Sequence, residues 1–202
     1  FNKENELNSS LFDKFNFNSS GSYRKYNTNI DEVDIVNDFV FKSNNQDKLS
    51  AADIDFNIIL KNINSYGDLS SSYKEGQDYR LLSAAVFDAK YPLFKEKNNN
   101  KSYLTPRISL RYSPNQGTNL INEKSIINYK DMFLLERINN KTVESGLSST
   151  LGLEYKNLNN FNDERFNFGL AVNFRDEEDA DLPKSSSLGQ KTSDIFGYSG
   201  LN

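Results

Sequence analysis

Residues 143–155 alternate between two kinds of side chain without a break, which is the pattern of a β-strand with a different environment on each face. One face carries the apolar residues Val143, Leu147, Leu151, Leu153 and Tyr155, and the other carries mostly small and polar residues with Glu144 and Glu154. A strand in a soluble protein is typically about 5–6 residues long, whereas a tilted strand that crosses an outer membrane needs about 9–11. The length of this run therefore favours a membrane barrel over a small soluble β domain.

Similar alternation recurs along most of the chain. Shorter runs lie at residues 15–17, 33–41, 54–60, 79–87, 104–112 and 166–174, and a last strand is expected to begin near Lys191. The connections alternate between short turns, such as the one at residues 98–100, and long polar loops, of which the longest opens at residues 114–117. Residues 131–138 are expected to form one or two helical turns within that loop.

Short turns that alternate with longer loops are typical of an up-and-down barrel. The sequence therefore predicts an all-β fold, an antiparallel up-and-down transmembrane β-barrel segment with roughly nine strands of a larger barrel. Residues 1–202 are assigned to this single domain. The chain starts at Phe1 and has no recognisable signal peptide, so it is interpreted as a fragment of a longer protein.

Aromatic residues lie near the ends of several expected strands, as in the aromatic girdles of membrane barrels. They are Tyr79, Tyr91, Tyr103, Tyr112, Tyr155, Phe166 and Phe174. Because Phe and Tyr also favour strands in soluble sheets, a soluble sandwich, barrel or β-solenoid stays open as an alternative.

The composition removes several classes of function. The chain has no His and no Cys, which excludes Ser-His-Asp and Cys-His nucleophile systems, thiolate or His-ligated metal sites and disulfides. The net charge of −4 offers no basic patch for nucleic acid. The mean hydropathy of −0.71 is compatible with a membrane barrel, since half of each strand and all loops are polar. We therefore expect neither an enzyme nor a cofactor-binding protein.

Charged residues fall on the polar faces of several expected strands. Arg107 and Arg111 share one such face, Arg175 lies on another strand, and Glu144 and Glu154 lie on a third. In a barrel these five side chains would face the lumen, where they would form ion pairs or contact an anionic ligand. The acidic run at residues 176–181 is either a solvated loop or a site for a divalent cation, but it lacks the spacing of an EF-hand.

A set of short motifs resembles the LptD family of lipopolysaccharide-assembly proteins (the organic solvent tolerance family). Residues 131–137 read Asp-Met-Phe-Leu-Leu-Glu-Arg and residues 142–146 read Thr-Val-Glu-Ser-Gly, close to the Asn-Leu-Phe, Asn-Arg and Arg-Val-Glu-x-Gly elements of that family. The matching positions are Pro106, Phe133, Arg137, Glu144, Gly146, Gly189, Gln190, Ser193, Asp194 and Gly197. The chain departs from the pattern at Glu136, Asn139, Asn140 and Thr142, and residues 1–103 match only in their strand pattern.

The resemblance implies a wall segment of a barrel in the outer membrane of a Gram-negative cell, without the jelly-roll domain of the family. The implied function is insertion of lipopolysaccharide into the outer leaflet. The implied partners are lipopolysaccharide, an LptE-like lipoprotein inside the barrel, periplasmic bridge proteins that reach the jelly-roll domain, and outer-membrane lipid. The alternatives are another outer-membrane barrel, such as a porin or a plugged transporter, and a soluble surface β protein or adhesin.

Overall fold

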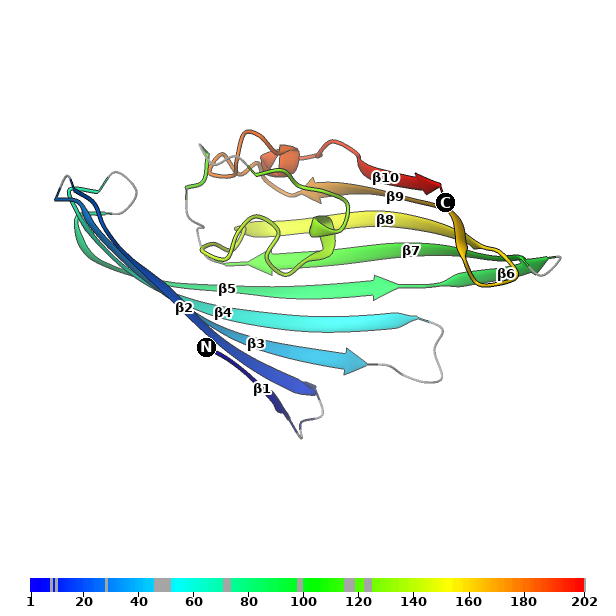
Figure 1. Ribbon diagram of the computed structural model, residues 1–202, viewed down its shortest axis with the longest axis horizontal. Coiled ribbons are helices and arrows are strands. Elements are labelled where there is room, and N and C mark those ends of the chain that lie inside the picture. Colours follow the sequence, from blue (N-terminus) through cyan, green and yellow to red (C-terminus); the bar gives the residue numbers. More distant parts are fainter. Residues whose placement is uncertain are drawn as a thin grey trace.

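The computed structural model describes residues 1–7, 9, 11–27, 29–45, 52–70, 74–97, 100–114, 119–121 and 125–201. Within them the chain forms one antiparallel sheet, in which strands follow one another in the order of the sequence (Figure 1). The strands are β1 (Asn2–Glu6), β2 (Lys14–Lys25), β3 (Asp31–Asn45), β4 (Asp53–Asp68), β5 (Gly76–Lys90), β6 (Leu93–Lys97), β7 (Asn100–Ser113), β8 (Gly146–Leu158), β9 (Glu164–Arg175) and β10 (Phe196–Leu201). The prediction of an all-β, antiparallel, up-and-down fold is confirmed.

The central strands are long. β3, β4 and β5 contain 15, 16 and 15 residues, and β7, β8 and β9 contain 14, 13 and 12. At about 3.3 Å per residue, β4 alone extends for roughly 50 Å. When alternation of period two continues over such a length, all apolar side chains lie on one face of the sheet and all polar ones on the other. Each face must then contact a single kind of environment along the whole strand.

Two prolines mark an interruption beside the middle of β7. β5 pairs with the second half of β7, and β6 pairs with the first half, so β5 and β6 act as one strand interrupted at Tyr91 and Pro92. The Tyr91 amide donates to the Pro106 carbonyl at 3.0 Å across this gap. Proline has no N–H to donate to a ladder, so the break falls where Pro92 follows Tyr91 on one strand and Pro106 lies opposite Tyr91 on the other. The path through the sheet thus has nine members, with β6 as an extension of β5.

The two faces of the sheet differ sharply. The convex face carries the apolar positions of the alternation, and Leu81, Leu110, Leu151 and Leu170 on it are 68%, 41%, 45% and 46% exposed. The concave face carries the polar positions together with several aliphatic residues. Because directly opposed residues of paired strands share a face, the rows continue across strands: Ser109 is opposite Thr150, and Thr150 is opposite Asn173.

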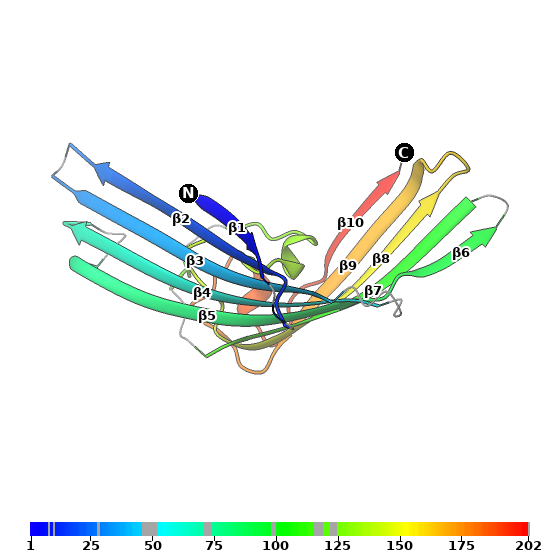
Figure 2. The same cartoon turned by 90° about the horizontal axis from the view of Figure 1, so that it is seen from below.

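Loop segments cover the concave face. In Figure 2 the sheet forms a trough whose two arms, β1–β5 and β7–β10, diverge around the loops that precede β8 and β10. Two apolar clusters lie beneath these loops. One joins Val36, Ile59, Ile63, Leu82, Ala84 and Val143, and the other joins Tyr129, Met132, Phe133, Ala171, Leu182 and Leu188. The expected helical turn is present as a single 3-10 turn, η1 (Asp131–Phe133), and a second one, η2 (Ser187–Gly189), precedes β10.

Two boundaries expected from the sequence are wrong. β8 begins at Gly146, not at residue 143, because Gly146 has a φ of 74° and turns the chain out of the sheet. Val143 is consequently buried in the concave cluster and does not share the exposed face of Leu147 and Leu151. The last strand begins at Phe196. Near Lys191, where it was expected to begin, the chain makes an isolated antiparallel bridge between Thr192 and Phe174 of β9. The turns expected at residues 98–100 and 114–117 lie largely outside the described residues.

The sheet does not close on itself. β1 and β10 stand at its two ends, and neither has a partner on its outer side among the described strands. The N-terminus and the C-terminal strand lie on opposite arms of the trough (Figure 2). In the described part of the chain, no helix is long and apolar enough to cross a membrane.

Candidate functional site

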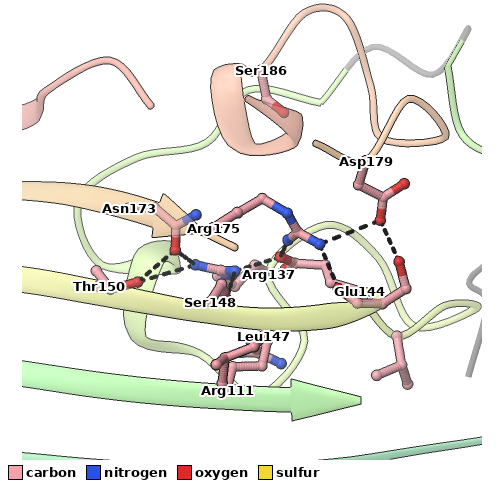
Figure 3. A network of polar contacts seen from close by, with 12 residues as sticks. Arg111, Arg137, Glu144, Leu147, Ser148, Thr150, Asn173, Arg175, Asp179 and Ser186 are labelled. Carbon is pink, nitrogen blue, oxygen red and sulfur yellow. Dashed lines mark hydrogen bonds and ion pairs between the residues drawn. The ribbon is translucent and has the colours of Figure 1, made fainter. Parts of the chain in front are cut away.

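The segment of residues 133–145 crosses the concave face, and Arg137 lies at its centre (Figure 3). The Arg137 side chain is 1% exposed and holds the carboxylate of Glu144 with two donors: Nε reaches Oε1 at 2.7 Å, and Nη2 reaches Oε2. Its remaining donors reach the sheet, at Thr150 Oγ1 (3.1 Å), Asn173 Oδ1 (3.0 Å) and Ser148 Oγ (3.2 Å). A two-donor contact of this kind between guanidinium and carboxylate is among the strongest polar contacts in proteins. Arg137 therefore fastens the segment to β8 and β9 at once.

Glu144 accepts from a second arginine. Nη1 of Arg175, at the end of β9, lies 3.5 Å from Oε2 of Glu144. Burial alone would raise the pKa of the Glu144 carboxyl, but the positive charges of Arg137, Arg111 and Arg175 outweigh it and lower the pKa to about 2. Glu144 is thus fully ionised at neutral pH and neutralises part of a buried cluster of positive charge.

Arg175 also ties the acidic loop to the start of β8. It donates to the Ser145 carbonyl, and its Nη2 is 3.5 Å from Oδ2 of Asp179. The hydroxyl of Ser145 donates to the same Asp179 oxygen at 2.7 Å. The loop of residues 176–181 is therefore held by internal contacts of Asp176 and Asp179, and the described residues contain no cluster of three acidic ligands suited to a metal ion.

The two arginines of β7 hold the first half of the crossing segment. Arg111 is 5% exposed and donates to the backbone carbonyls of Leu134 and Leu135, the latter at 2.6 Å. Arg107 pairs with Asp88 of β5 at 2.8 Å, and its guanidinium lies 4.1 Å from the centre of the Phe133 ring. Arg107, Arg111 and Arg175 all lie on the concave face of the sheet, and of these three only Arg175 contacts Glu144 directly.

Glu154 lies at the other end of the polar face of β8, beneath a tyrosine of the loop. Burial and the negative charge of Glu154 both disfavour the phenolate of Tyr129, so the pKa of Tyr129 lies above its usual value. Tyr129 packs edge-on against Tyr198 of β10, with ring centres 5.1 Å apart. Glu154 thus belongs to a polar and aromatic area separate from the Arg137 cluster.

A lysine on β4 anchors the segment to the opposite arm of the trough. Lys61 has no exposed side-chain surface, and its Nζ contacts Asp38 and Glu136 at 2.5 Å each and the Asn140 carbonyl at 2.7 Å. Lys141 adds a contact of 3.2 Å to Asp34 on β3. Segment 133–145 therefore joins β3 and β4 on one arm to β7, β8 and β9 on the other.

Three glycines of the motif set occupy positions where a side chain does not fit or is strained. Gly146 has a positive φ, as described above. A Cβ at Gly189 would lie 2.4 Å from the Asp179 carbonyl oxygen, and one at Gly197 would lie 2.9 Å from a Leu170 methyl group. Gly152, outside the motif set, would place a Cβ 2.4 Å from the Phe133 ring. At Gly189, Gly197 and Gly152 the neighbouring atoms leave no room for a Cβ, and at Gly146 the positive φ disfavours one.

Ser193, Asp194 and Gln190 make backbone and side-chain hydrogen bonds in the segment that leads into β10. Ser193 continues the edge of β9: its amide donates to the Asn173 carbonyl at 2.9 Å, and its hydroxyl accepts from the Asn173 amide at 2.8 Å. The Asp194 amide donates to Ser187 Oγ at 2.8 Å, and the Gln190 amide closes η2 onto the Ser187 carbonyl. Pro106 lies apart from this area, exposed on the convex face.

Sequence reasoning missed Lys61, Thr150 and Asn173 as members of the buried polar area. The one available signal was Lys61 itself, which shares the period-two face of Ile59 and Ile63. A lysine between two buried aliphatic positions needs a carboxylate partner, but the sequence does not reveal that Glu136 is brought to it from far along the chain. The contacts of the described residues in this area anchor the crossing segment and neutralise buried charges.

Beside the crossing segment, the concave face of β2–β5 contains a groove of about 810 Å³. It is polar at its floor, with Asn16, Asn57, Asp55 and Asp88 among its lining residues. In comparisons with known proteins, no protein-family description matches the sequence, and no curated protein is similar enough to count as a relative.

Proposed function

We propose that this chain forms part of the wall of an outer-membrane β-barrel that delivers lipopolysaccharide to the outer leaflet, as in the LptD family that its motifs resemble. The observation that carries the membrane part is the inverted polarity of the sheet. Aliphatic residues are bare on the convex face, while three arginines, Lys61 and several carboxylates are buried on the concave face.

A soluble protein of this architecture would bury its apolar face and leave its charged face in water. Here the apolar face extends over β3–β9, and none of the described segments covers it, so it goes far beyond the scattered apolar residues of ordinary surfaces. The hydrocarbon core of a bilayer can surround such a face without exposing it to water. Strands of 12–16 residues are long enough to cross that core at a tilt. Open sheet edges are not tolerated in lipid, so β1 and β10 would each pair with a further strand in the membrane.

Two observations favour the lipopolysaccharide-assembly family within the class of membrane barrels. Four residues that carry the resemblance lie on the crossing segment or at its end. Arg137 and Glu144 form a buried ion pair that fastens the segment to the concave face, Phe133 lies against the Arg107 guanidinium, and Gly146 turns the chain into β8. The polar groove beside that loop offers a contact surface for a segment of a partner inside the barrel, such as a lipoprotein of the LptE kind.

A plugged transporter is the second candidate, because the same loop fills part of the concave face. Both functions share the membrane location and differ in the cargo. The test must therefore separate location from cargo.

The location is tested by labelling single cysteines, since the natural chain contains none. The assembled protein carries an environment-sensitive fluorophore at Leu110, Leu151 or Leu170, with Asn57 on the concave face as the matched control. Bilayers with brominated acyl chains should quench the first three labels and spare the fourth. Equal quenching at all four positions, or none, would overturn the membrane location.

The cargo is tested by depleting the protein in its own organism and detecting lipopolysaccharide on the cell surface with a membrane-impermeant probe. The proposal expects lipopolysaccharide to disappear from the surface and accumulate inside. Normal surface lipopolysaccharide together with loss of uptake of a small solute would assign the plugged-transporter function instead.

A further inference from the structure

A groove lies on the convex side of the hairpin formed by β6 and β7. Figure 1 shows this hairpin at the end of the sheet away from the loops that cover the trough. Its volume is about 670 Å³. The residues that matter for its chemistry are Lys95, Lys97, Asn100, Ser102, Leu104 and Tyr155. Nothing in the mechanism proposed above uses this groove.

The strand register places the groove at the end of the apolar band. Leu93 is opposite Leu104, and Leu104 is opposite Tyr155, so these three share the convex face with Ile108 and Leu151. Lys95 is opposite Ser102, and Lys97 is opposite Asn100, on the same face one and two steps further out. The apolar band therefore ends in a polar and basic rim.

Aromatic rings form the boundary between band and rim. Tyr155 stacks on Phe168 with ring centres 5.6 Å apart, and it lies 6.1 Å from Phe166. Rings with a polar tip or edge favour the level of lipid headgroups, between hydrocarbon and water. This sets the depth at which the two lysines would lie.

The charge of the groove is positive and uncompensated within the described residues. Lys95 and Lys97 lie on an exposed strand and make no ion pair with any described residue, and no carboxylate lines the groove. Glu96 points to the opposite face, where it is opposed by Lys101. Two ammonium groups beside the Ser102 hydroxyl and the Asn100 amide form a set of donors suited to a phosphate.

We propose that this groove binds the phosphate headgroup of an anionic phospholipid whose acyl chains lie along the apolar band of β7 and β8. The inference rests on the proposed membrane location, because the band must face lipid for the chains to reach it. Lysine stems of this length lie along apolar surface while the ammonium stays at headgroup level. The charge complementarity favours an anionic lipid over a zwitterionic one.

The test uses the full chain in mixed detergent micelles that contain either phosphatidylglycerol or phosphatidylcholine with the same acyl chains, and native mass spectrometry counts the bound lipids. The natural chain should retain phosphatidylglycerol in preference to phosphatidylcholine. Each lysine near an anionic surface is worth roughly a fivefold gain in binding, so Lys95→Gln with Lys97→Gln should lose roughly thirtyfold in affinity for phosphatidylglycerol. Lys101→Gln is the matched control, since Lys101 lies on the other face of the same hairpin and contacts Asn162, and it should leave the preference unchanged.

The failures are distinguishable. A chain that stays monomeric in water and takes up no lipid of either kind would overturn the membrane location and this site together. Lipid uptake without a preference, or a preference that survives the double substitution, would overturn this site alone. Displacement of phosphatidylglycerol by inorganic phosphate at equal concentration would show a free anion site and would also contradict the proposal.

Discussion

At the scale of single residues, the molecule depends on a few buried charges that are matched in pairs. Arg137 and Glu144 neutralise each other, and Lys61 is shared by Asp38 and Glu136. Removing one member of such a pair leaves a buried charge without compensation, which costs far more than the pair itself contributes.

Replacing Arg137 with Met should release segment 133–145 from the sheet. The loss leaves Glu144 buried with the longer, 3.5 Å contact to Arg175 in place of its two-donor partner, at a cost of up to about 3–5 kcal/mol, and removes the contacts to Thr150 and Asn173. Hydrogen exchange should then show fast exchange in residues 134–145 while β3–β5 stay protected. The double variant Arg137→Met with Glu144→Met is the control and should recover part of the protection; no recovery would contradict the pairing.

Acid should loosen the same segment. The Glu144 carboxyl has a pKa of about 2 when folded, below the ordinary value of 4.5. Because its pKa is lower in the folded state than in the unfolded state, ionised Glu144 stabilises the folded protein above pH 4.5. This contribution of about 3 kcal/mol is lost as the pH falls from 4.5 toward 2. Protease cleavage within residues 134–145 should therefore increase across that pH range in the natural protein. The increase should be absent from Glu144→Gln, which has no carboxyl to titrate there.

At the scale of elements, the molecule is shaped by where strands stop. Pro92 and Pro106 interrupt the ladder between β5 and β7, and Gly146 ends the loop and begins β8. Neither proline nor glycine changes the alternation of apolar and polar positions. The alternation alone therefore does not predict that strands are interrupted or begin at these residues.

Gly146→Ala should destabilise the entry into β8. The φ of 74° at this position costs a residue with a Cβ about 1–2 kcal/mol, although the nearest atom to a new Cβ, Asp176 Oδ1, is 3.4 Å away. Urea unfolding should detect the loss. Gly146→Asn should cost less, since Asn tolerates this conformation better; an equal cost for both would point to crowding and not to backbone strain.

At the scale of the whole molecule, one sheet separates an apolar surface from a charged interior. Segment 133–145 holds the two arms of the trough at a fixed spacing, because its contacts reach both of them. This part of the concave face is filled by aliphatic residues and buried ion pairs and is not an open water-lined surface.

Arginine on the convex face should destabilise the protein in a bilayer by about 2–4 kcal/mol near the midplane. Leu60→Arg and Leu151→Arg test this expectation, measured as unfolding free energy in lipid vesicles. Asn57→Arg, on the open concave groove of the same strand as Leu60, is the matched control and should cost much less. Thr150 lies on the polar face of β8, opposite to that of Leu151, but it is unsuitable as a control. It is 2% exposed and contacts Arg137, so an arginine there would disrupt the buried cluster. Equal losses for Leu60→Arg and Asn57→Arg would show that the two faces have been assigned wrongly.

The sequence by itself determined the all-β class, the up-and-down order of the strands and the two faces of the alternating runs in β3, β4, β5, β7, β8 and β9. The alternation is local, and each strand of 12–16 residues repeats it often enough to specify its own orientation, as β4 and β9 do. The polar positions of Arg107, Arg111 and Arg175 followed from the same pattern. Only the tertiary structure decided that Val143 is buried, that Arg137 and not Arg107 pairs with Glu144, and that Lys61 meets Glu136. These contacts join residues from 7 to 75 positions apart through the path of a loop, and a loop has no period from which its path can be deduced.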